Sequence, residues 1–522
     1  MKRLWRLIYS RTFFVLLSVF LTIWFVIWSV SFVADAIPFL WVLLQVFSVI
    51  VAISIVNRPM NAAFKLTWSV FVLAVPVFGA IFYYIMRSNL EVVRYRKAFK
   101  KQNAFFKNYL SQNYAHQSQL ALDYLKDLDR EQTGIATYMT NYVGFPLELG
   151  TQAQYFPSGQ AYFDQLIKEL EGAQTYIFME YYIVDFGYMW NTILNILKRK
   201  AAQGVEVRFL YDGMNSLTFL PYHYYKELEQ FQIKSKVFSQ IIPALSTVQN
   251  NRDHRKITVI DGRVAFTGGI NLADEYINRI ERFGYWKDAG IMVKGGAVLN
   301  FTLMFLQMWN FNNKSLTEDV RYLDDIIENH SLPVQPSKDA VFLAYGENPF
   351  NGEEVSKRLY LDMIQSAKET IDIMTPYLIL DDEMMDNLTY AAKRGVQVRF
   401  LLPAIYDKQS AYLASRTDFD VYIEAGIHIY EYQPGFVHSK VMLVDGLKAT
   451  VGSVNMDFRS LYLNFECNLY IYNHPQVLHA IKEDFASSYK KSKEITLEAF
   501  RKQYPWYKRI AGNFMKIFSP LL

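Results

Sequence analysis

One pattern occurs twice in this chain: histidine, any residue, lysine, four residues, aspartate and then glycine. The first copy lies in RDHRKITVIDGRVAFTGGIN, residues 252–271, and the second in FVHSKVMLVDGLKATVGSVN, residues 436–455. Both stretches otherwise suit buried strands, where a charged group is costly unless it is paired or used. In both copies, a Gly-Gly or Gly-Ser pair begins six residues after the glycine of the Asp-Gly pair. An asparagine lies two residues beyond that second pair. The duplicated polar set therefore predicts a functional site built from two halves.

The repeat extends beyond the two motifs. AQTYIFMEYYIVD at 173–185 is similar to KETIDIMTPYLILD at 368–381, and AAQGVEVRFLYD at 201–212 is similar to AAKRGVQVRFLLP at 391–403. Apolar runs between amphipathic helices favour an α/β fold with a mixed central sheet in each half. We therefore predict two tandem α/β domains with pseudo-two-fold symmetry. Their predicted bounds are 111–328 and 340–522, with the Pro- and Ser-containing linker 329–339 between them.

The histidine and lysine of each motif are two residues apart, so both point to one face of a strand. These pairs are His254 with Lys256 and His438 with Lys440. The aspartates, Asp261 and Asp445, fall at the opposite parity and precede glycine, which is a hairpin-turn signal. From the residues alone they can be structural turn residues or members of the catalytic set.

A returning strand and a third strand supply further polar groups in each half. Glycine amides and Ser or Asn side chains can hold an anion, which makes four positions candidate phosphate ligands. These are Gly269, Asn271, Ser453 and Asn455. Asp288 and Glu466 align in the repeat, and we expect each carboxylate to hydrogen-bond the histidine of its own half and fix its tautomer.

Two His, two Lys and their amide donors brought to one pocket suit a phosphodiester. One neutral imidazole can attack phosphorus, and the other can protonate the leaving oxygen and then deprotonate the incoming nucleophile. Lysine is a poor metal ligand at neutral pH, and the one cysteine, Cys467, excludes a thiolate zinc site. We therefore expect neither a metal nor a cofactor.

The hydrophobic fraction, 52%, is concentrated at the N-terminus. Three uncharged segments, 12–34, 36–56 and 66–86, are each long enough to cross a bilayer as helix. The third contains Pro76 and Gly79, so a buried soluble helix is its alternative. With the basic residues that follow, the segments define a predicted membrane anchor over 1–110.

The anchor predicts a multi-pass protein of the bacterial cell membrane. Basic residues flank the segments in nearly equal number on both sides and do not fix the orientation, although we expect the catalytic domains on the cytoplasmic side. The C-terminal YPWYKRIAGNFMKIFSPLL, residues 504–522, mixes residues as interfacial segments do, and an ordinary packed helix is the alternative. The net charge of +4 does not indicate a polyanion binder, and no oligomeric state follows.

The paired HRKITVID and HSKVMLVD motifs, with GGIN and GSVN after them, resemble the phospholipase D superfamily. The hydrophobic N-terminal region, EYYI at 180–183, TPYLI at 375–379 and the terminal KIFSPLL are similar to its bacterial cardiolipin-forming family. The resemblance covers nearly all of 38–522, and the segment 12–34 is an addition to the usual two-span anchor. The motif Asp positions, Asp261 and Asp445, join the two His and two Lys in the implied catalytic set.

The resemblance implies transfer of a phosphatidyl group from one phosphatidylglycerol to another, giving cardiolipin and glycerol through a phosphatidyl-histidine. It also implies that the N-terminal histidine, His254, is the nucleophile. The same constellation serves lipid hydrolases, phosphatidylserine synthases and nucleases. The charge balance and the anchor favour lipid over nucleic acid, and a non-enzymatic membrane scaffold is the remaining alternative.

Overall fold

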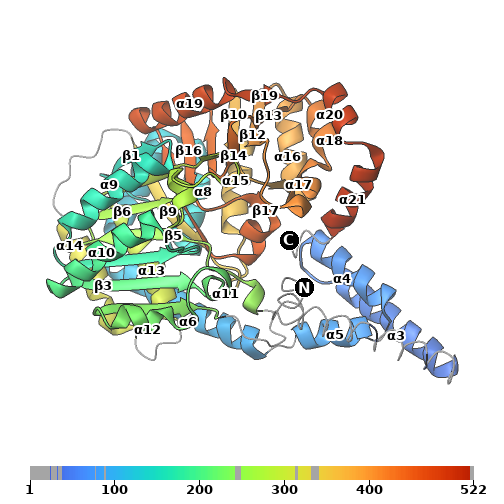
Figure 1. The fold of residues 1–522 in the computed structure, drawn as a ribbon, viewed down its shortest axis with the longest axis horizontal. Helices are drawn as coiled ribbons and strands as arrows, with labels where there is room; N and C mark the ends of the chain where they lie inside the picture. The colour runs from blue at the N-terminus through green and yellow to red at the C-terminus, as the bar shows by residue number, and fades with distance from the viewer. Residues whose placement is uncertain are drawn as a thin grey trace, which may run out of the picture. The chain divides into compact units, whose positions relative to one another are not determined.

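The computed structural model describes residues 24, 32, 38–76, 78–87, 90–240, 248–311, 316–330 and 340–517. The chain divides into two compact units, Met1–Asn89 and Leu90–Leu522 (Figure 1). The sequence predicted this boundary near residue 110. It falls earlier because helix α6 (Leu90–Asn113) buries Phe99 and Phe106 in the core of the second unit. The basic segment after the apolar region is therefore part of the α/β body.

In the first unit, α3 (Pro38–Val56) is followed by a turn and by α4 (Ala62–Ala74) and α5 (Phe78–Arg87). Helix α3 coincides with the predicted segment 36–56 and is long and apolar enough to cross a membrane. Val51 and Ile55 of α3, Val72 of α4 and Tyr83 of α5 are buried together, so the three helices share a small core.

The prediction of one continuous helix over 66–86 is wrong. Helix α4 ends at Ala74, and α5 begins at Phe78. Pro76 lies between them, and proline inside a helix removes a backbone hydrogen bond and clashes with the preceding turn. The segment 12–34 lies outside the described residues, apart from Trp24 and Phe32.

The second unit contains two mixed sheets, one from each half of the repeat. In spatial order, the first sheet consists of β1 (Gln152–Phe156), β8 (Gly290–Lys294), β6 (Val264–Gly268), β5 (Lys256–Ile260), β2 (Tyr176–Tyr181), β3 (Glu206–Asp212) and β4 (Ile233–Phe238). The second consists of β9 (Val341–Glu347), β18 (Glu466–Tyr472), β16 (Lys448–Gly452), β15 (Val441–Val444), β10 (Thr370–Met374), β12 (Gln397–Pro403), β13 (His428–Tyr432) and β19 (Ser492–Glu494).

The two sheets repeat one topology. In each, the strand after the histidine, β5 or β15, pairs antiparallel with the first strand of a strand–helix–strand unit, β2 or β10. The next two pairings, β2–β3–β4 and β10–β12–β13, are parallel. This arrangement confirms the predicted tandem α/β halves with mixed sheets. Strand β16 contacts β6 and β8, and β18 contacts β6, so the sheets pack against each other.

Short strands also join the halves. Strand β7 (Tyr285–Lys287) of the first half pairs in parallel with β14 (Gly435–Val437) of the second. Conversely, Asp253 of the first half forms a parallel bridge with Phe465 of the second half. Each segment that precedes a motif histidine is thus held by the other half, which fixes the two histidines relative to each other.

Candidate active site

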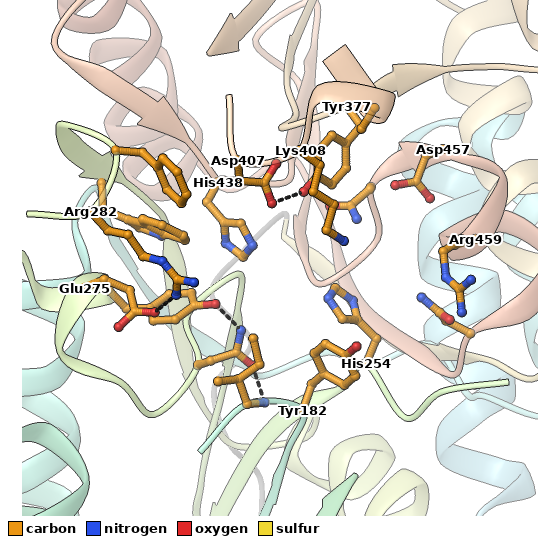
Figure 2. Close-up of a pocket in the computed structure, with 18 of the residues that line it drawn as sticks. Tyr182, His254, Glu275, Arg282, Tyr377, Asp407, Lys408, His438, Asp457 and Arg459 are labelled. Carbon is orange, nitrogen blue, oxygen red and sulfur yellow. Dashed lines mark hydrogen bonds and ion pairs between the residues drawn. The ribbon is translucent and has the colours of Figure 1, made fainter. Parts of the chain in front are cut away.

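The two motif histidines lie on opposite sides of one cavity of about 520 Å³, which both halves of the second unit line (Figure 2). His254 comes just before β5 and His438 just before β15. Each imidazole side chain exposes only 12% of its surface. The lining residues are Tyr182, Ile183, Phe219, His254, Asn271, Glu275, Tyr276, Arg282, Phe283, Trp286, Tyr377, Ile379, Asp407, Lys408, Ser410, Ala411, His438, Asn455, Asp457, Phe458, Arg459 and Asn464.

The carboxylates behind the histidines are exchanged between the halves. Nδ1 of His254 lies 2.9 Å from Oε2 of Glu466, and Nδ1 of His438 lies 2.7 Å from Oδ2 of Asp288. The prediction that each acid holds a histidine ring is confirmed, but the prediction that it holds the ring of its own half is wrong. The backbone explains the exchange, because His254 N donates to Phe465 O and His438 N donates to Lys287 O. Each histidine is thereby placed beside the acid of the other half.

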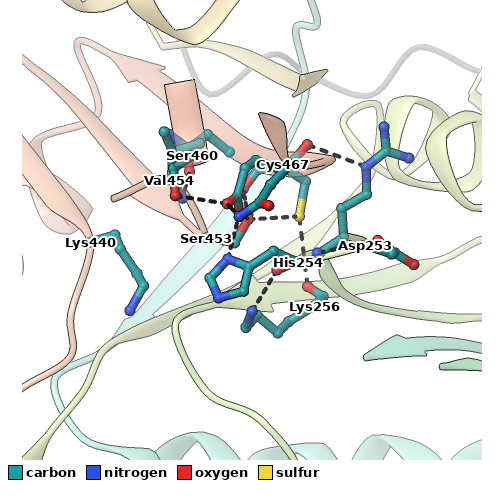
Figure 3. A network of polar contacts seen from close by, with 12 residues as sticks. Asp253, His254, Lys256, Lys440, Ser453, Val454, Ser460 and Cys467 are labelled. Carbon is teal, nitrogen blue, oxygen red and sulfur yellow. Dashed lines mark hydrogen bonds and ion pairs between the residues drawn. The ribbon is translucent and has the colours of Figure 1, made fainter. Parts of the chain in front are cut away.

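Glu466 is held by several donors besides His254. Ser460 Oγ lies 2.8 Å from its Oε1, the side-chain amide of Asn464 also donates to Oε1, and Ser453 Oγ donates to Oε2 (Figure 3). Burial raises the pKa of Glu466 to about 7, while Lys256 and these hydroxyl donors act in the opposite direction. The network fixes the carboxylate and hence the His254 ring.

Ser453 and Gly269 occupy equivalent positions, and neither lines the cavity. The hydroxyl of Ser453 is used on Glu466. At Gly269, a Cβ atom would lie 2.1 Å from Oδ1 of Asp288 and 2.8 Å from the His438 carbonyl oxygen. The prediction of these two residues as phosphate ligands is therefore corrected: both residues shape the support of a histidine, and glycine leaves room for the aspartate.

Asn271 and Asn455 do line the cavity. The side chain of Asn271 is already engaged, because its Oδ1 accepts from Ile183 N at 3.0 Å and its Nδ2 donates to Tyr276 OH at 2.7 Å. In this arrangement Asn271 braces the wall of the cavity. Asn455 remains a candidate phosphate ligand.

The two motif lysines lie behind the histidines and are buried. Each ammonium group donates to the carbonyl oxygen of its own motif histidine, Lys256 to His254 and Lys440 to His438. Burial lowers the pKa of Lys256 to about 8 and that of Lys440 to about 7. A phosphate anion between the histidines would oppose this effect and favour the charged lysines.

Burial also lowers the pKa of both histidines, and the charges beside the two rings differ. Burial and the positive charge of Lys440 lower the pKa of His438 to about 4, while the Asp288 carboxylate acts in the opposite direction. The pKa of His254 falls well below its ordinary value, because Lys256, Lys440, Arg459 and Lys408 add to the effect of burial. The charges around His254 thus favour its neutral form, whereas Asp288 favours the protonated form of His438.

Asp261 and Asp445 lie at turns, as the Asp-Gly reading predicted. Asp261 has φ of 52° and Asp445 has φ of 55°. The carboxylate of Asp261 accepts from the backbone N–H groups of residues 174–176, and that of Asp445 accepts from those of residues 368–370. Neither residue lines the cavity, so their assignment to the catalytic set is corrected to a structural one.

Several cavity residues were missed by sequence reasoning. Tyr182 packs edge-on against His254, with ring centroids 4.9 Å apart. Arg459 and Lys408 bring positive charge to the cavity, and Arg282 is paired with Glu275 at 3.1 Å. Most of these residues lie in connections between strands and helices, where no periodicity marks them. In the described parts of the chain, no three His, Cys, Asp or Glu side chains are grouped to hold a metal ion.

Comparison with known sequences identifies two profiles in the chain. Residues 166–288 and 360–489 each match the profile described as the PLD-like domain of cardiolipin synthase. Residues 46–87 match the profile described as the phospholipase D-nuclease N-terminal region. The two copies of the first profile each contain one of the motif histidines.

Similar whole chains are found among bacterial proteins. An uncharacterized protein of Streptococcus mutans is 42% identical over 90% of this chain and 98% of its own length. A cardiolipin synthase of Geobacillus kaustophilus is 36% identical over 92% of each chain. A crystal structure of the phosphatidylserine synthase of Haemophilus influenzae aligns with a TM-score of 0.57 and 14% identity, over 74% of this chain and 100% of that one. At that identity the last comparison shows a shared fold alone.

Proposed function

This chain belongs to the cardiolipin synthase family of the phospholipase D superfamily, and from that premise we propose how its cavity carries out the reaction. It is a phospholipid phosphatidyltransferase that forms cardiolipin. The donor and the acceptor are both phosphatidylglycerol, and glycerol is released. One observation carries the proposal: the two histidines lie across one cavity, with Nδ1 of each on a carboxylate and Nε2 left for the substrate.

His254 is the proposed nucleophile. Its neutral Nε2 attacks phosphorus of the first phosphatidylglycerol, and the bond from phosphorus to the glycerol oxygen breaks. His438, in its protonated form, gives its Nε2 proton to that oxygen, and glycerol leaves. The charges beside the two rings support this division: the Asp288 carboxylate favours the protonated form of His438, which the acid needs, and cationic side chains favour the neutral form of His254, which the nucleophile needs.

The second step transfers the phosphatidyl group from His254 to the acceptor lipid. His438 takes a proton from the headgroup hydroxyl of a second phosphatidylglycerol, whose oxygen attacks phosphorus as the phosphorus–His254 bond breaks. Lys256 and Lys440, supported by Asn455, stabilise the charge on the non-bridging oxygens. Asp288 and Glu466 hold the rings in one tautomer, and no metal or cofactor takes part in a step.

The membrane arrangement is also part of the proposal. Helix α3 and the apolar helices α4 and α5 form a multi-pass anchor in the bacterial cell membrane, with the catalytic halves on the cytoplasmic side. Helix α21 (Trp506–Ile517) lies against α17 (Gln409–Arg416), which contributes Ser410 and Ala411 to the cavity. Trp506 and Ile510 of α21 expose 73% and 60% of their surface. We assign this helix to the lipid interface.

The test is to incubate the purified full-length protein with phosphatidylglycerol as the only lipid. We expect cardiolipin and free glycerol in equal amounts, and we expect neither product from His254→Ala or His438→Ala, each of which should remain folded. Phosphatidic acid without cardiolipin would identify a hydrolase instead. Turnover that persists in both single variants would refute the two-histidine mechanism.

A further inference from the structure

Asp407 places a carboxylate in the wall of the cavity, and one of its two oxygens has no hydrogen-bond partner among the described residues. The residue lies in the short connection between β12 and α17. Its Oδ2 accepts from Tyr377 OH at 2.6 Å (Figure 2). Its Oδ1 is buried and has no hydrogen-bond partner among the described residues. Since a buried acceptor without a donor costs free energy, the carboxylate of Asp407 is a candidate ligand-binding group.

The acceptor lies on the His438 side of the cavity. Figure 2 shows Asp407 beside His438, while Arg459 lies beyond His254. Tyr276 is close to both residues. Its ring centroid lies 5.4 Å from that of His438, and Asp407 adds to the effect of burial in raising the pKa of Tyr276. In the proposed mechanism, this is the side from which glycerol leaves and the acceptor hydroxyl enters.

The chemistry of the headgroup matches this acceptor. An ionised phosphodiester has no hydrogen to donate, whereas each hydroxyl of glycerol is a donor. A carboxylate can only accept, so Asp407 is not itself a phosphate ligand. An ammonium headgroup would also meet the positive charge of Lys408, which is next in the chain and lines the same cavity. A neutral polyol suits the pair better than choline or ethanolamine does.

The feature belongs to one half only. In the first half, residues 213–218 follow the equivalent strand β3 and contain no carboxylate. The transfer needs just such an asymmetry, because the phosphorus is shared by both histidines but the alcohol occupies one side. An acceptor near one histidine alone marks the alcohol side.

We infer that Asp407, held by Tyr377, is the subsite for the glycerol headgroup and accepts a hydrogen bond from one of its hydroxyls. The inference rests on the proposed function and adds a specificity-determining residue to it. Asp407 selects which alcohol receives the phosphatidyl group, and the histidine pair performs the transfer. Tyr377 is a positioning residue, because it reaches the alcohol only through the carboxylate.

An acceptor competition tests the inference. The full-length protein receives phosphatidylglycerol with labelled acyl chains and equal concentrations of deuterated glycerol, 1-propanol and ethanolamine, and each labelled product is counted by mass spectrometry. The variants are Asp407→Ala, the isosteric Asp407→Asn and Tyr377→Phe. The control is Glu424→Gln, an exposed carboxylate paired with Arg501 on the surface. Total transfer, summed over all products, reports the proposed function separately.

We expect the wild type and the control to prefer glycerol to 1-propanol. Asp407→Ala should lower the ratio of the two products at least about tenfold, because a hydrogen bond to a charged group is lost. Asp407→Asn should lower it, and Tyr377→Phe should do so by a smaller factor. An unchanged ratio in both Asp407 variants, with transfer continuing, would overturn the inference. So would a wild-type preference for ethanolamine. Absence of any transfer in the wild type would instead refute the proposed function on which the inference depends.

Discussion

The two histidines are chemically alike but sit in different electrostatic surroundings. His438 has Asp288 as its main opposing influence against burial and Lys440. Four cationic groups reinforce the effect of burial on His254. The carboxylate favours protonation of His438 and the cationic groups favour neutral His254, which is the direction that a general acid and a nucleophile require. Each carboxylate is therefore expected to affect only the role of the histidine that it holds: Asp288 the general acid His438, and Glu466 the nucleophile His254.

The substitution Asp288→Asn tests this expectation for the general acid, His438. Asp288 raises the pKa of His438, so its loss lowers that pKa further. A general acid works only while protonated, and activity is lost as the pH rises through its pKa. The high-pH limb of kcat/KM should therefore move to lower pH, with a loss of about 10²-fold or more at neutral pH. Glu466→Gln, which acts on His254, should leave that limb in place. An unmoved limb in Asp288→Asn would contradict the assignment.

A matched pair of substitutions tests the support of the histidines. Gly269→Ala places a Cβ at 2.1 Å from the Asp288 carboxylate and should displace it, with a loss of activity of about 10²-fold or more. Ser453→Ala at the equivalent position removes one donor to Glu466 and should cost about tenfold. Both losses are measured as kcat at saturating lipid. A larger loss in Ser453→Ala than in Gly269→Ala would contradict the geometry.

At the scale of elements, the Asp-Gly turns hold strands together and are remote from the chemistry. Asp261 ties the turn after β5 to the start of β2 through the N–H groups of residues 174–176. Burial opposes ionisation, but these hydrogen bonds prevail and lower the pKa of Asp261. A depressed folded-state pKa gives stability that is present above the unfolded value, about 4, and is lost as pH falls through the folded value.

Asp261→Asn should therefore destabilise the fold by about 1 kcal/mol at neutral pH, because the amide keeps only one of the two accepting oxygens. The difference from wild type should shrink as the pH falls below about 4. Asparagine tolerates the left-handed backbone, so the turn itself is preserved. Thermal unfolding measures the loss, and turnover well below the melting temperature should stay near that of wild type. A loss of turnover above 100-fold with an unchanged Tm would restore the catalytic reading.

Helix α21 offers a second test at this scale. The one cysteine, Cys467, is buried, so a surface cysteine can be labelled selectively. An environment-sensitive dye on Ile510→Cys should shift to shorter wavelength in phosphatidylglycerol nanodiscs, because the side chain enters the interface. The same dye on Gln503→Cys, which is exposed on α20 (Leu497–Gln503), should not shift. Equal spectra at the two sites would place α21 in water.

At the scale of the whole molecule, the sequence predicted what repeats and missed what joins the repeats. The spacing of His254 and Lys256, the apolar runs and the aligned acids predicted two α/β halves around a shared site. The exchange of Asp288 and Glu466 could not be predicted, because periodicity gives the face of a strand but not the chain segment beside it. The same is true of Asp407, because the equivalent loop of the first half, residues 213–218, contains no carboxylate that could have marked the position.

The break near Pro76 was visible in the sequence, since proline rarely continues a helix. The apolar length of 66–86 outweighed that signal in the prediction. The roles of Ser453 and Gly269 had no such signal. A serine or glycine after a strand suits an anion site as well as a support for a neighbouring carboxylate, and only the backbone pairing of Ser453 N with Cys467 O places it behind Glu466.

Trapping the intermediate tests the central claim, a phosphatidyl group carried on one histidine, most directly. The full-length enzyme is quenched during turnover of labelled phosphatidylglycerol and digested, and the labelled peptide is identified by mass spectrometry. We predict an adduct on the peptide that contains His254, formed within one turnover and absent from His254→Ala. An adduct only on the peptide that contains His438 would reverse the assignment of nucleophile. Steady formation of cardiolipin with no adduct on either peptide would contradict the covalent mechanism.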